Sequence, residues 1–326
     1  MPESRILETS NTDPTINLAM EEALLLGENE GPSLFLWQNA HTVVIGRGQN
    51  AWKECRVTML REEGGTLVRR STGGGAVYHD LGNLNFSFLM PKALYDVPRQ
   101  LDVIRAAVRA FGVETERSGR NDIVLKDSGA KFSGNAFRHT QTASLHHGTI
   151  LMDVDMALLG RYLAPSQAKL AAKGVQSVRA RVGNLRELAP SVTIQGLKDA
   201  LFDAFRKEYG PAQLTGLGEA AGEGAIRELT EKYRSWEWTY GATPRFDATL
   251  ETRFAWGGVE LLLSLAQGRV TQAQCFTDAN DPDLGERVAA ALVGAAFTPE
   301  GLAERLLGHP AQEDRDVGEW LREQSL

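Results

Sequence analysis

The sequence predicts an α+β fold in two parts, a large domain over residues 1–241 and a small one over residues 242–326. In the first part, segments with strand and helix patterns are mixed, and pairs of strands joined by short turns replace the strict strand-helix alternation of a doubly wound sheet. After Pro244, three strand-like segments are followed by three helical ones. That order is typical of a separate small α+β domain.

The first helix is predicted to begin at Asp13, because an aspartate before a proline is a start signal and apolar residues then recur at helical spacing up to Leu24. A second helix is expected over residues 51–64, where Gly64 ends it. The strands expected here are apolar, β-rich runs bounded by turn residues, at 33–37, 42–46, 66–70, 76–80 and 83–90. The last two are expected to form a hairpin through Leu81 and Gly82.

The same mixture continues along the chain. Residues 122–138 have the pattern of strand, turn and strand. Further helices are expected at 98–111, 156–163 and 193–210, further strands at 144–152, 246–256, 259–267 and 269–278, and the C-terminal helices at 284–294, 301–308 and 316–324. A segment rich in Gly and Ala, 211–224, precedes a polar helix that leads to YRSWEW (233–238).

Composition argues against several classes of protein. The net charge of −7 does not favour a general nucleic-acid-binding or anionic-membrane-binding surface. The two cysteines, Cys55 and Cys275, supply neither a disulfide framework nor a zinc ligand set, which fits a reducing compartment. The N-terminal residues are polar and acidic, and no run approaches the ~20 apolar residues of a membrane span. We therefore expect a soluble cytoplasmic protein with no nucleic-acid or membrane partner.

Two glycine motifs are candidates for phosphate binding. VVIGRGQNA (43–51) has the spacing of a dinucleotide fingerprint, but the hairpins downstream do not support the doubly wound sheet that it needs, so a tight turn is favoured. The run 73–75 is three glycines, which let backbone N–H groups approach an anion closely, and Arg69 and Arg70 can offer guanidinium groups. On this local pattern an anion cradle and a bulged hairpin with exposed arginines are equally supported.

Lys131 is the candidate cation of a reacting centre. It lies between small residues in GAKFSG (129–134), where an ammonium can reach a carboxylate or phosphate and stabilise developing charge. Asp122 could hold a metal or orient Lys131. The adjacent His146 and His147 point to opposite faces of a strand, so at most one of them faces any given pocket and a zinc site is not favoured. Taken singly, an exposed lysine and hydrogen-bonded structural histidines remain alternatives.

Five stretches occur in one order and at suitable separations: RRSTGGGAVYHDLGNL, SGRNDIVL, GAKFSGNAFR, LHHGTILM and LAAKGVQSVRARV. Together they resemble the lipoate–protein ligase A family. Earlier and later segments are also similar to that family, namely NLAMEEAL, LFLWQNAHTVVIGRGQN, WKEC, YRSWEW and WGGVEL. The resemblance covers nearly the whole chain, including a small C-terminal domain characteristic of the long bacterial form.

The resemblance implies a catalytic domain of the biotin and lipoate ligase type, similar to class II aminoacyl-tRNA synthetase cores, with a mixed β-sheet flanked by helices. It also implies two reaction steps that use ATP, Mg²⁺ and lipoate. Lipoate first attacks the α-phosphate of ATP to give lipoyl-AMP and pyrophosphate, and a lysine of an acceptor then takes the lipoyl group. The implied acceptors are apo lipoyl domains of 2-oxoacid dehydrogenase complexes and the glycine cleavage H protein.

Residue roles are implied in the same way. Lys131 would be catalytic and would contact both the lipoate carboxyl group and the α-phosphate. The other residues expected to bind ATP or the adenylate are Arg70, Gly75, Ala76, Val77, Tyr78 and Asp122, of which Asp122 is the candidate metal ligand. The other residues expected to bind lipoate are Ser71, Gly74, His79, Arg138 and His147. An apolar tunnel for the acyl chain is expected between the first helix and the adjoining strands.

Three other functions share parts of this pattern. An octanoyl transferase has the same fold but moves its acyl chain through a cysteine thioester, and residues 173–182, where that thiol is expected, contain no cysteine. A biotin ligase is expected to carry a different, arginine-rich glycine loop. A non-catalytic lipoate- or nucleotide-binding protein is expected to lack the cation at the reacting position, whereas Lys131 is present.

Overall fold

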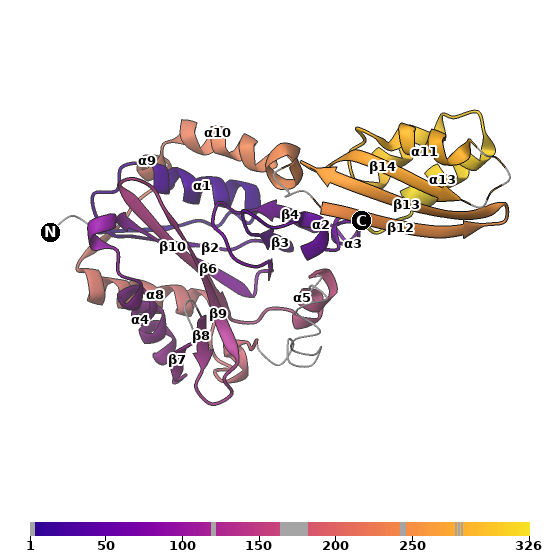
Figure 1. The fold of residues 1–326 in the computed structure, drawn as a ribbon. Coiled ribbons are helices and arrows are strands. Elements are labelled where there is room, and N and C mark those ends of the chain that lie inside the picture. Colours follow the sequence, from indigo (N-terminus) through magenta and orange to yellow (C-terminus); the bar gives the residue numbers. More distant parts are fainter. Residues whose placement is uncertain are drawn as a thin grey trace.

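The computed structural model describes residues 4–118, 122–163, 182–241, 246–277, 279, 281 and 283–326. A large α+β part surrounds an eight-stranded sheet, and a smaller part with its own three-stranded sheet lies beside the short helices α2 and α3 (Figure 1). Within these ranges no helix is long and apolar enough to cross a membrane. The predicted division at residues 241 and 242 stays a prediction, because residues 242–245 lie outside those described.

The central sheet of the large part is mixed. From edge to edge its strands are β11 (Ala212–Leu214), β1 (Ser4–Glu8), β2 (Ser33–Trp37), β6 (Asn83–Pro91), β10 (Ala143–Leu151), β9 (Lys131–His139), β8 (Asp122–Leu125) and β7 (Thr115–Ser118). The first three run parallel and the other neighbours are antiparallel. The sequence analysis missed β1, β7 and β11. The last two are short, largely exposed edge strands without a buried apolar face to reveal them.

Helices cover both faces of this sheet (Figure 1). The helices of the large part are α1 (Pro14–Leu26), α2 (Ala51–Glu54), α3 (Val57–Glu62), α4 (Val97–Arg109), α5 (Met156–Tyr162), α8 (Ile194–Tyr209), α9 (Leu217–Ala221) and α10 (Glu223–Arg234), with short turns η1 (Lys92–Leu94), η2 (Leu185–Glu187) and η3 (Glu237–Gly241). Because side chains alternate along β2, Leu34 and Leu36 pack with α4 and α8, whereas Phe35 and Trp37 pack with α1 on the opposite face. The predicted mixed sheet flanked by helices is confirmed.

Polar side chains set where the main helices begin. Asp13 Oδ1 accepts hydrogen bonds from the backbone N–H groups of Thr15 (2.8 Å) and Ile16 (3.4 Å). These groups lie in the first turn of α1, so no carbonyl group within the helix can accept from them. Asp96 and Thr193 cap α4 and α8 in the same way. The predicted start of α1 is therefore correct.

A second, three-stranded sheet carries the glycine run, in the order β4 (Thr66–Arg69), β3 (Thr42–Ile45) and β5 (Val77–His79). The hairpin predicted through Leu81 and Gly82 is wrong, because β5 pairs with β3 while β6 pairs with β2 and β10 of the central sheet. The predicted helix over 51–64 is also two helices, α2 and α3, separated at Cys55, whose backbone forms a bridge to Leu163.

The C-terminal part is an antiparallel sheet covered by helices on one face. Its elements are β12 (Phe246–Phe254), β13 (Gly257–Ala266), β14 (Arg269–Thr277), α11 (Leu284–Leu292), α12 (Pro299–Leu307) and α13 (Gln312–Arg322). Along β13 alternate residues such as Leu261 and Leu263 are buried against the helices. Trp52 of α2 reaches this part, with its ring 5.4 Å from the ring of Phe297.

Candidate functional site

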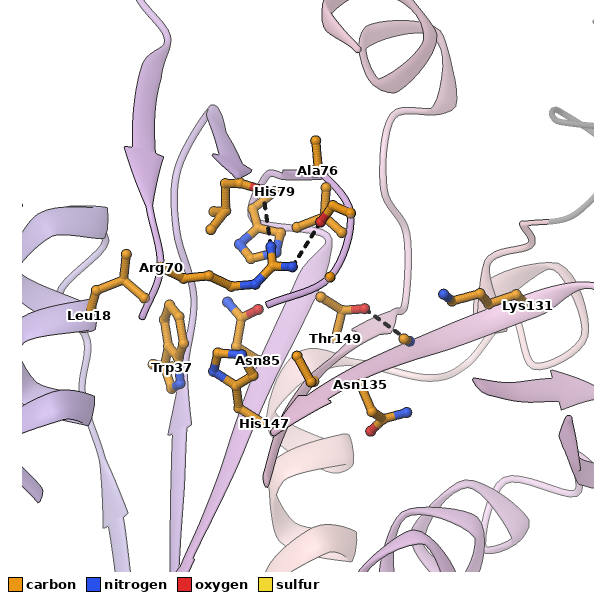
Figure 2. Close-up of a pocket in the computed structure, with 17 residues that line it drawn as sticks. Leu18, Trp37, Arg70, Ala76, His79, Asn85, Lys131, Asn135, His147 and Thr149 are labelled. Carbon is orange, nitrogen blue, oxygen red and sulfur yellow. Dashed lines mark hydrogen bonds between the residues drawn. The ribbon is translucent and has the colours of Figure 1, made fainter. Parts of the chain in front are cut away.

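A pocket opens where the loop between β4 and β5 meets the central sheet (Figure 2). The predicted site residues that line it are Arg70, Gly74, Gly75, Ala76, Val77, His79, Lys131 and His147. The other lining residues are Leu18, Trp37, Val44, Asn85, Gly134, Asn135, Ala136, Gly148 and Thr149. Figure 2 shows Lys131 at one end and Leu18 and Trp37 at the other, so the pocket has a charged end and an apolar end.

Arg70 shapes the glycine loop from beneath. Its buried guanidinium donates hydrogen bonds to the carbonyl oxygens of Gly73 (2.7 Å) and Gly75 (2.8 Å), and to Thr72 Oγ1 (3.0 Å). Burial lowers the pKa of Arg70 to about 10, so the group stays charged near neutral pH. Because these donors already have acceptors in the loop, Arg70 positions the backbone that a ligand would meet.

The Gly46 motif belongs to the same loop. A Cβ atom at Gly46 would lie 2.2 Å from the carbonyl oxygen of Gly74, which itself has a φ of +94°. Only glycine at both positions lets the two backbone segments approach this closely. The tight-turn interpretation of residues 43–51 is therefore favoured over a dinucleotide fingerprint.

Arg69 does not face the pocket, which corrects the expectation that it offers its guanidinium to a phosphate. Its side chain is fully buried and donates to the carbonyl oxygens of Thr239 (2.7 Å), Gln49 (2.6 Å), Gly46 (3.1 Å) and Trp238 (3.1 Å). Arg69 is thus a structural residue that ties β4 to the turn η3, which leads toward the C-terminal part.

Lys131 forms the charged end of the pocket. Its Nζ lies 2.7 Å from Asp122 Oδ1, and the lysine side chain is 36 % exposed, so the ammonium is paired yet accessible. A Cβ atom at Gly134 would lie 2.7 Å from that Nζ, so the small residue beside the lysine keeps space for it. Of the two roles considered for Asp122, orienting Lys131 has direct geometric support.

The two adjacent histidines face opposite ways, as the strand pattern predicts. His147 lines the pocket, and its Nδ1 lies 2.8 Å from Glu21 Oε1. His146 is fully buried on the other face, between Gln100 (2.7 Å) and Asn135 (2.8 Å). Burial lowers the pKa of His146 to about 3, so its role is structural.

Two buried nitrogen donors line the pocket without an acceptor. Asn39 Nδ2 donates to His79 Nδ1 (3.2 Å), which leaves the ring proton of neutral His79 on Nε2, and burial lowers the pKa of this histidine to about 3. Asn83 Nδ2 donates a hydrogen bond to Asn85 Oδ1 (2.9 Å). Among the described residues neither His79 Nε2 nor Asn85 Nδ2 has a hydrogen-bond partner. Buried donors of this kind are suited to an oxygen atom of a ligand.

Comparison with known families assigns this architecture. Residues 13–206 match the lipoyl protein ligase A/B catalytic domain family, and residues 243–314 match the bacterial lipoate protein ligase C-terminus family. The chain belongs to the lipoyl protein ligase A/B family. The resemblance seen in the sequence is thereby confirmed. The second match covers the elements from β12 to α12 of the C-terminal part.

Solved structures of lipoate ligases share the fold of this family member. The Plasmodium falciparum LipL1 complex with lipoate is 29 % identical, matches 98 % of this chain and 100 % of its own, and has a TM-score of 0.64. A bipartite lipoate protein ligase of Thermoplasma acidophilum, studied with its E2 lipoyl domain, is 29 % identical over 73 % of this chain and 96 % of its own, with a TM-score of 0.66. A lipoate-protein ligase A bound with ATP is 29 % identical over 73 % and 98 %, with a TM-score of 0.61.

Some predicted ligase site residues lie outside the pocket lining. Arg138 points from β9 to Glu22 of α1, with Nη1 2.8 Å from its Oε1, rather than to the pocket. Tyr78 is buried, with its ring 6.0 Å from His41 and 5.7 Å from Tyr162, so it could meet a ligand through its backbone only. Ser71 belongs to the loop, but its side chain is not among the lining groups of the described residues. The expected segment LAAKGVQSVRARV, residues 170–182, falls almost entirely outside the described residues.

The sequence analysis also missed residues of this pocket. Trp37, Asn85 and Thr149 line the pocket, and Glu21 contacts its lining residue His147. Asparagines alternating with apolar residues in NLNFS (83–87), and two glutamates inside an apolar helix, were usable signals. Both patterns place polar side chains where the fold buries them.

Proposed function

We propose that this chain is an ATP-dependent lipoate–protein ligase that forms lipoyl-AMP and then lipoylates a lysine of an acceptor protein. The observation that carries the proposal is the order of groups along one pocket. The accessible ammonium of Lys131 lies at one end, the apolar side chains of Leu18 and Trp37 at the other, and the glycine loop between them. A carboxylate with an apolar tail matches that order. Among similar structures, one holds lipoate and another ATP.

In the first step a lipoate carboxylate oxygen attacks the α-phosphorus of ATP, an oxygen–phosphorus bond forms, and the bond to the β-phosphate breaks as pyrophosphate leaves. The Lys131 ammonium neutralises charge on the carboxylate and on the α-phosphoryl oxygens. Asp122 keeps that ammonium in place through the 2.7 Å ion pair. The N–H donors of His79 and Asn85 are available to further ligand oxygens.

In the second step the unprotonated ε-amine of an acceptor lysine attacks the acyl carbon. The carbon–oxygen bond to the phosphate breaks, AMP takes the bonding electrons, and the new amide nitrogen releases a proton to solvent. Lys131 again lies beside the leaving phosphate, so one ammonium serves both steps.

Magnesium is expected to accompany ATP. Among the described residues no group of three or more His, Cys, Asp or Glu side chains could hold a metal by itself. Mg²⁺ is commonly held by one or two carboxylates together with substrate phosphates, and Asp122 beside Lys131 fits that limited role. Mg²⁺ would supply charge neutralisation of the phosphates there.

The acceptors proposed for this ligase are apo lipoyl domains of 2-oxoacid dehydrogenase complexes and the glycine cleavage H protein. The similar archaeal ligase was studied with its E2 lipoyl domain, which supports the first class. A cytoplasmic location is proposed with them, and no nucleic-acid or membrane partner is expected.

The octanoyl transferase alternative needs a reactive thiol at the pocket. Cys55 is buried among apolar residues, and that burial raises its pKa to about 12. Cys275 lies on β14 of the C-terminal part, where burial raises its pKa to about 11. Neither thiol lines the pocket of the described residues. A thioester mechanism has no support from these positions.

The direct test incubates the full chain with lipoate, ATP and Mg²⁺, measures pyrophosphate, and then adds an apo lipoyl domain for mass analysis. Lipoate-dependent pyrophosphate release followed by the mass gain of one lipoyl group is expected. Acylation from octanoyl carrier protein alone, without pyrophosphate, would instead identify a transferase. Binding of lipoate or ATP without either product would identify a non-catalytic binding protein.

A further inference from the structure

A chain of buried hydrogen bonds runs behind the pocket from α1 to the glycine loop. Glu21 of α1 contacts His147 Nδ1 through both carboxylate oxygens, at 2.8 and 2.9 Å. His147 Nε2 lies 2.8 Å from Thr72 Oγ1, and Thr72 Oγ1 accepts from Arg70 Nε at 3.0 Å. Arg70 in turn holds the loop carbonyl groups. These contacts join α1, β10 and the loop between β4 and β5.

Counting donors favours one set of proton positions along this chain. Thr72 Oγ1 accepts from Arg70, and its own O–H finds an acceptor in the chain only if it donates to His147 Nε2. His147 then carries a proton on Nδ1, which donates to Glu21. Every donor in the chain has an acceptor only with this arrangement. The Glu21 carboxylate therefore selects the tautomer of His147, as a carboxylate behind a histidine commonly does.

Glu21 is an unusual residue for its position. Its side chain is 2 % exposed on α1, whose buried residues are mostly apolar, and a second donor, Ser87 Oγ, reaches its Oε1 at 2.5 Å. A buried carboxylate is costly unless its oxygens are satisfied, and here both are. The opposite charge is the buried guanidinium of Arg70, which lies at the other end of the same chain.

The glycine loop has few other anchors. Gly73, Gly74 and Gly75 are exposed, and nothing lies within 4 Å of a Cβ built at the first or the third of them. Arg70 holds the carbonyl groups of Gly73 and Gly75, and Arg70 is itself held by Thr72 and by the carbonyl oxygen of Val44 (3.2 Å). The loop conformation thus depends on groups beneath it rather than on its own packing.

We propose that Glu21 is a positioning residue that holds the glycine loop in its ligand-binding conformation through His147, Thr72 and Arg70. The inference deepens the proposed function, because the loop that Glu21 positions would be the backbone that binds the nucleotide. The effect of Glu21 on the loop conformation, however, concerns the ligand-free protein. Among the described residues no hydrogen bond joins Glu21 to the loop directly, so its hydrogen-bonded link to the loop runs through His147 and Thr72.

The test is a double-mutant cycle between two residues that do not touch, Glu21→Gln and Thr72→Val, followed by amide hydrogen exchange of Arg47 and Arg70 in the free full chain. The Arg47 N–H donates to the carbonyl oxygen of Thr72 (2.8 Å) and the Arg70 N–H to that of Ile45 (2.9 Å), so both amides report on the base of the loop. In Glu21→Gln the side chain offers one oxygen to the donors of His147 and Ser87 and leaves a buried NH₂ group facing them. Thr72→Val removes only the hydroxyl group. Each variant is expected to speed exchange about tenfold, the cost of one lost hydrogen bond to a charged group, and the double variant to speed it no further. The matched control is Glu28→Gln, an exposed acid just beyond α1.

Exchange rates that add in the double variant, or that stay at the wild-type value in Glu21→Gln, overturn the proposal. Affinity for a non-hydrolysable ATP analogue, measured on the same variants, separates it from the proposed function. If wild type binds no nucleotide but the exchange cycle is non-additive, the positioning role stands and the ligase proposal fails. If the analogue binds and both single variants weaken it without changing exchange, the positioning role fails.

Discussion

The Nζ atom of Lys131 lies 2.7 Å from Asp122 Oδ1, between neighbouring strands of the central sheet. The register places Asp122 opposite Gly134, and the missing side chain of that glycine gives the lysine room to lie over the strand. The carboxylate thus anchors an ammonium whose side chain is still 36 % exposed. This geometry suits a cation that must contact a ligand.

Lys131→Ala is expected to lower both adenylate formation and lipoyl transfer by 10²-fold or more, roughly the effect of removing a charge-stabilising donor from a reaction centre. Asp122→Asn is expected to cause a smaller loss, about tenfold, because the ammonium remains but loses its anchor. Lipoate-dependent pyrophosphate release and single-turnover transfer from isolated lipoyl-AMP are the two measurements.

The control for these variants is Lys126→Ala, an exposed lysine in the turn before β9. It is expected to behave as wild type in both assays. Wild-type pyrophosphate release from Lys131→Ala would remove the lysine from the first step and leave the proposed mechanism without its cation.

The parts of this site that were predictable from the sequence are those set by local pattern. The glycine run, the small residues around Lys131, and the opposite orientation of His146 and His147 follow from chain geometry that no tertiary contact overrides. The fold class followed from element order and from motifs spread along the chain. Apart from the fold class, these features need only neighbours in sequence.

The parts that were not predictable depend on contacts between distant segments. The burial of Arg69 requires carbonyl groups some 170 residues further on, and the Glu21 partner of His147 lies 126 residues away from it. The strands β5 and β6 looked like a hairpin because a turn pair joins them, yet each pairs with strands of a different sheet. Local turn chemistry cannot report such a choice.

Arg69→Lys is expected to destabilise the protein by about 3 kcal/mol. One ammonium cannot reach the several carbonyl groups to which the guanidinium group donates, so some of these buried carbonyl groups are left without a donor. Burial lowers the pKa of Arg69 to about 10, so the native group is still charged at neutral pH and its replacement tests geometry rather than charge. Urea unfolding of the variant against Arg227→Lys, an exposed arginine of α10, is the measurement. Equal stabilities would show that the buried fork is dispensable.

Cys55→Ala is expected to retain full ligase activity and to lose about 1 kcal/mol of stability, the cost of trimming a buried side chain. Because burial raises the pKa of this thiol to about 12, the native enzyme should also resist iodoacetamide at pH 7.5, where the thiolate is scarce. Activity before and after alkylation, with the modified sites mapped by mass spectrometry, checks both statements. Inactivation that tracks alkylation of Cys55 would revive the thioester mechanism.

His79 is expected to make the protein less stable in mild acid. Burial first, and then the nearby Arg70 and His147, lower the pKa of His79 to about 3, whereas an unfolded histidine titrates near 6.5. Between those pKa values His79 is protonated in the unfolded state and neutral in the folded state. The contribution of this group to the free energy of unfolding is therefore fully present above about pH 6.5 and decreases as the pH falls toward 3. At pH 5 this one group should cost about 2 kcal/mol relative to pH 7 and above.

Urea unfolding at pH 7.5 and pH 5 measures this effect. Between the two pH values His79→Gln should lose less stability than wild type, while His139→Gln, at an exposed histidine of β9, should lose as much as wild type. If His79→Gln loses as much stability in acid as wild type, His79 is not held neutral in the fold, and its Nε2–H is not the fixed donor that the pocket geometry assigns.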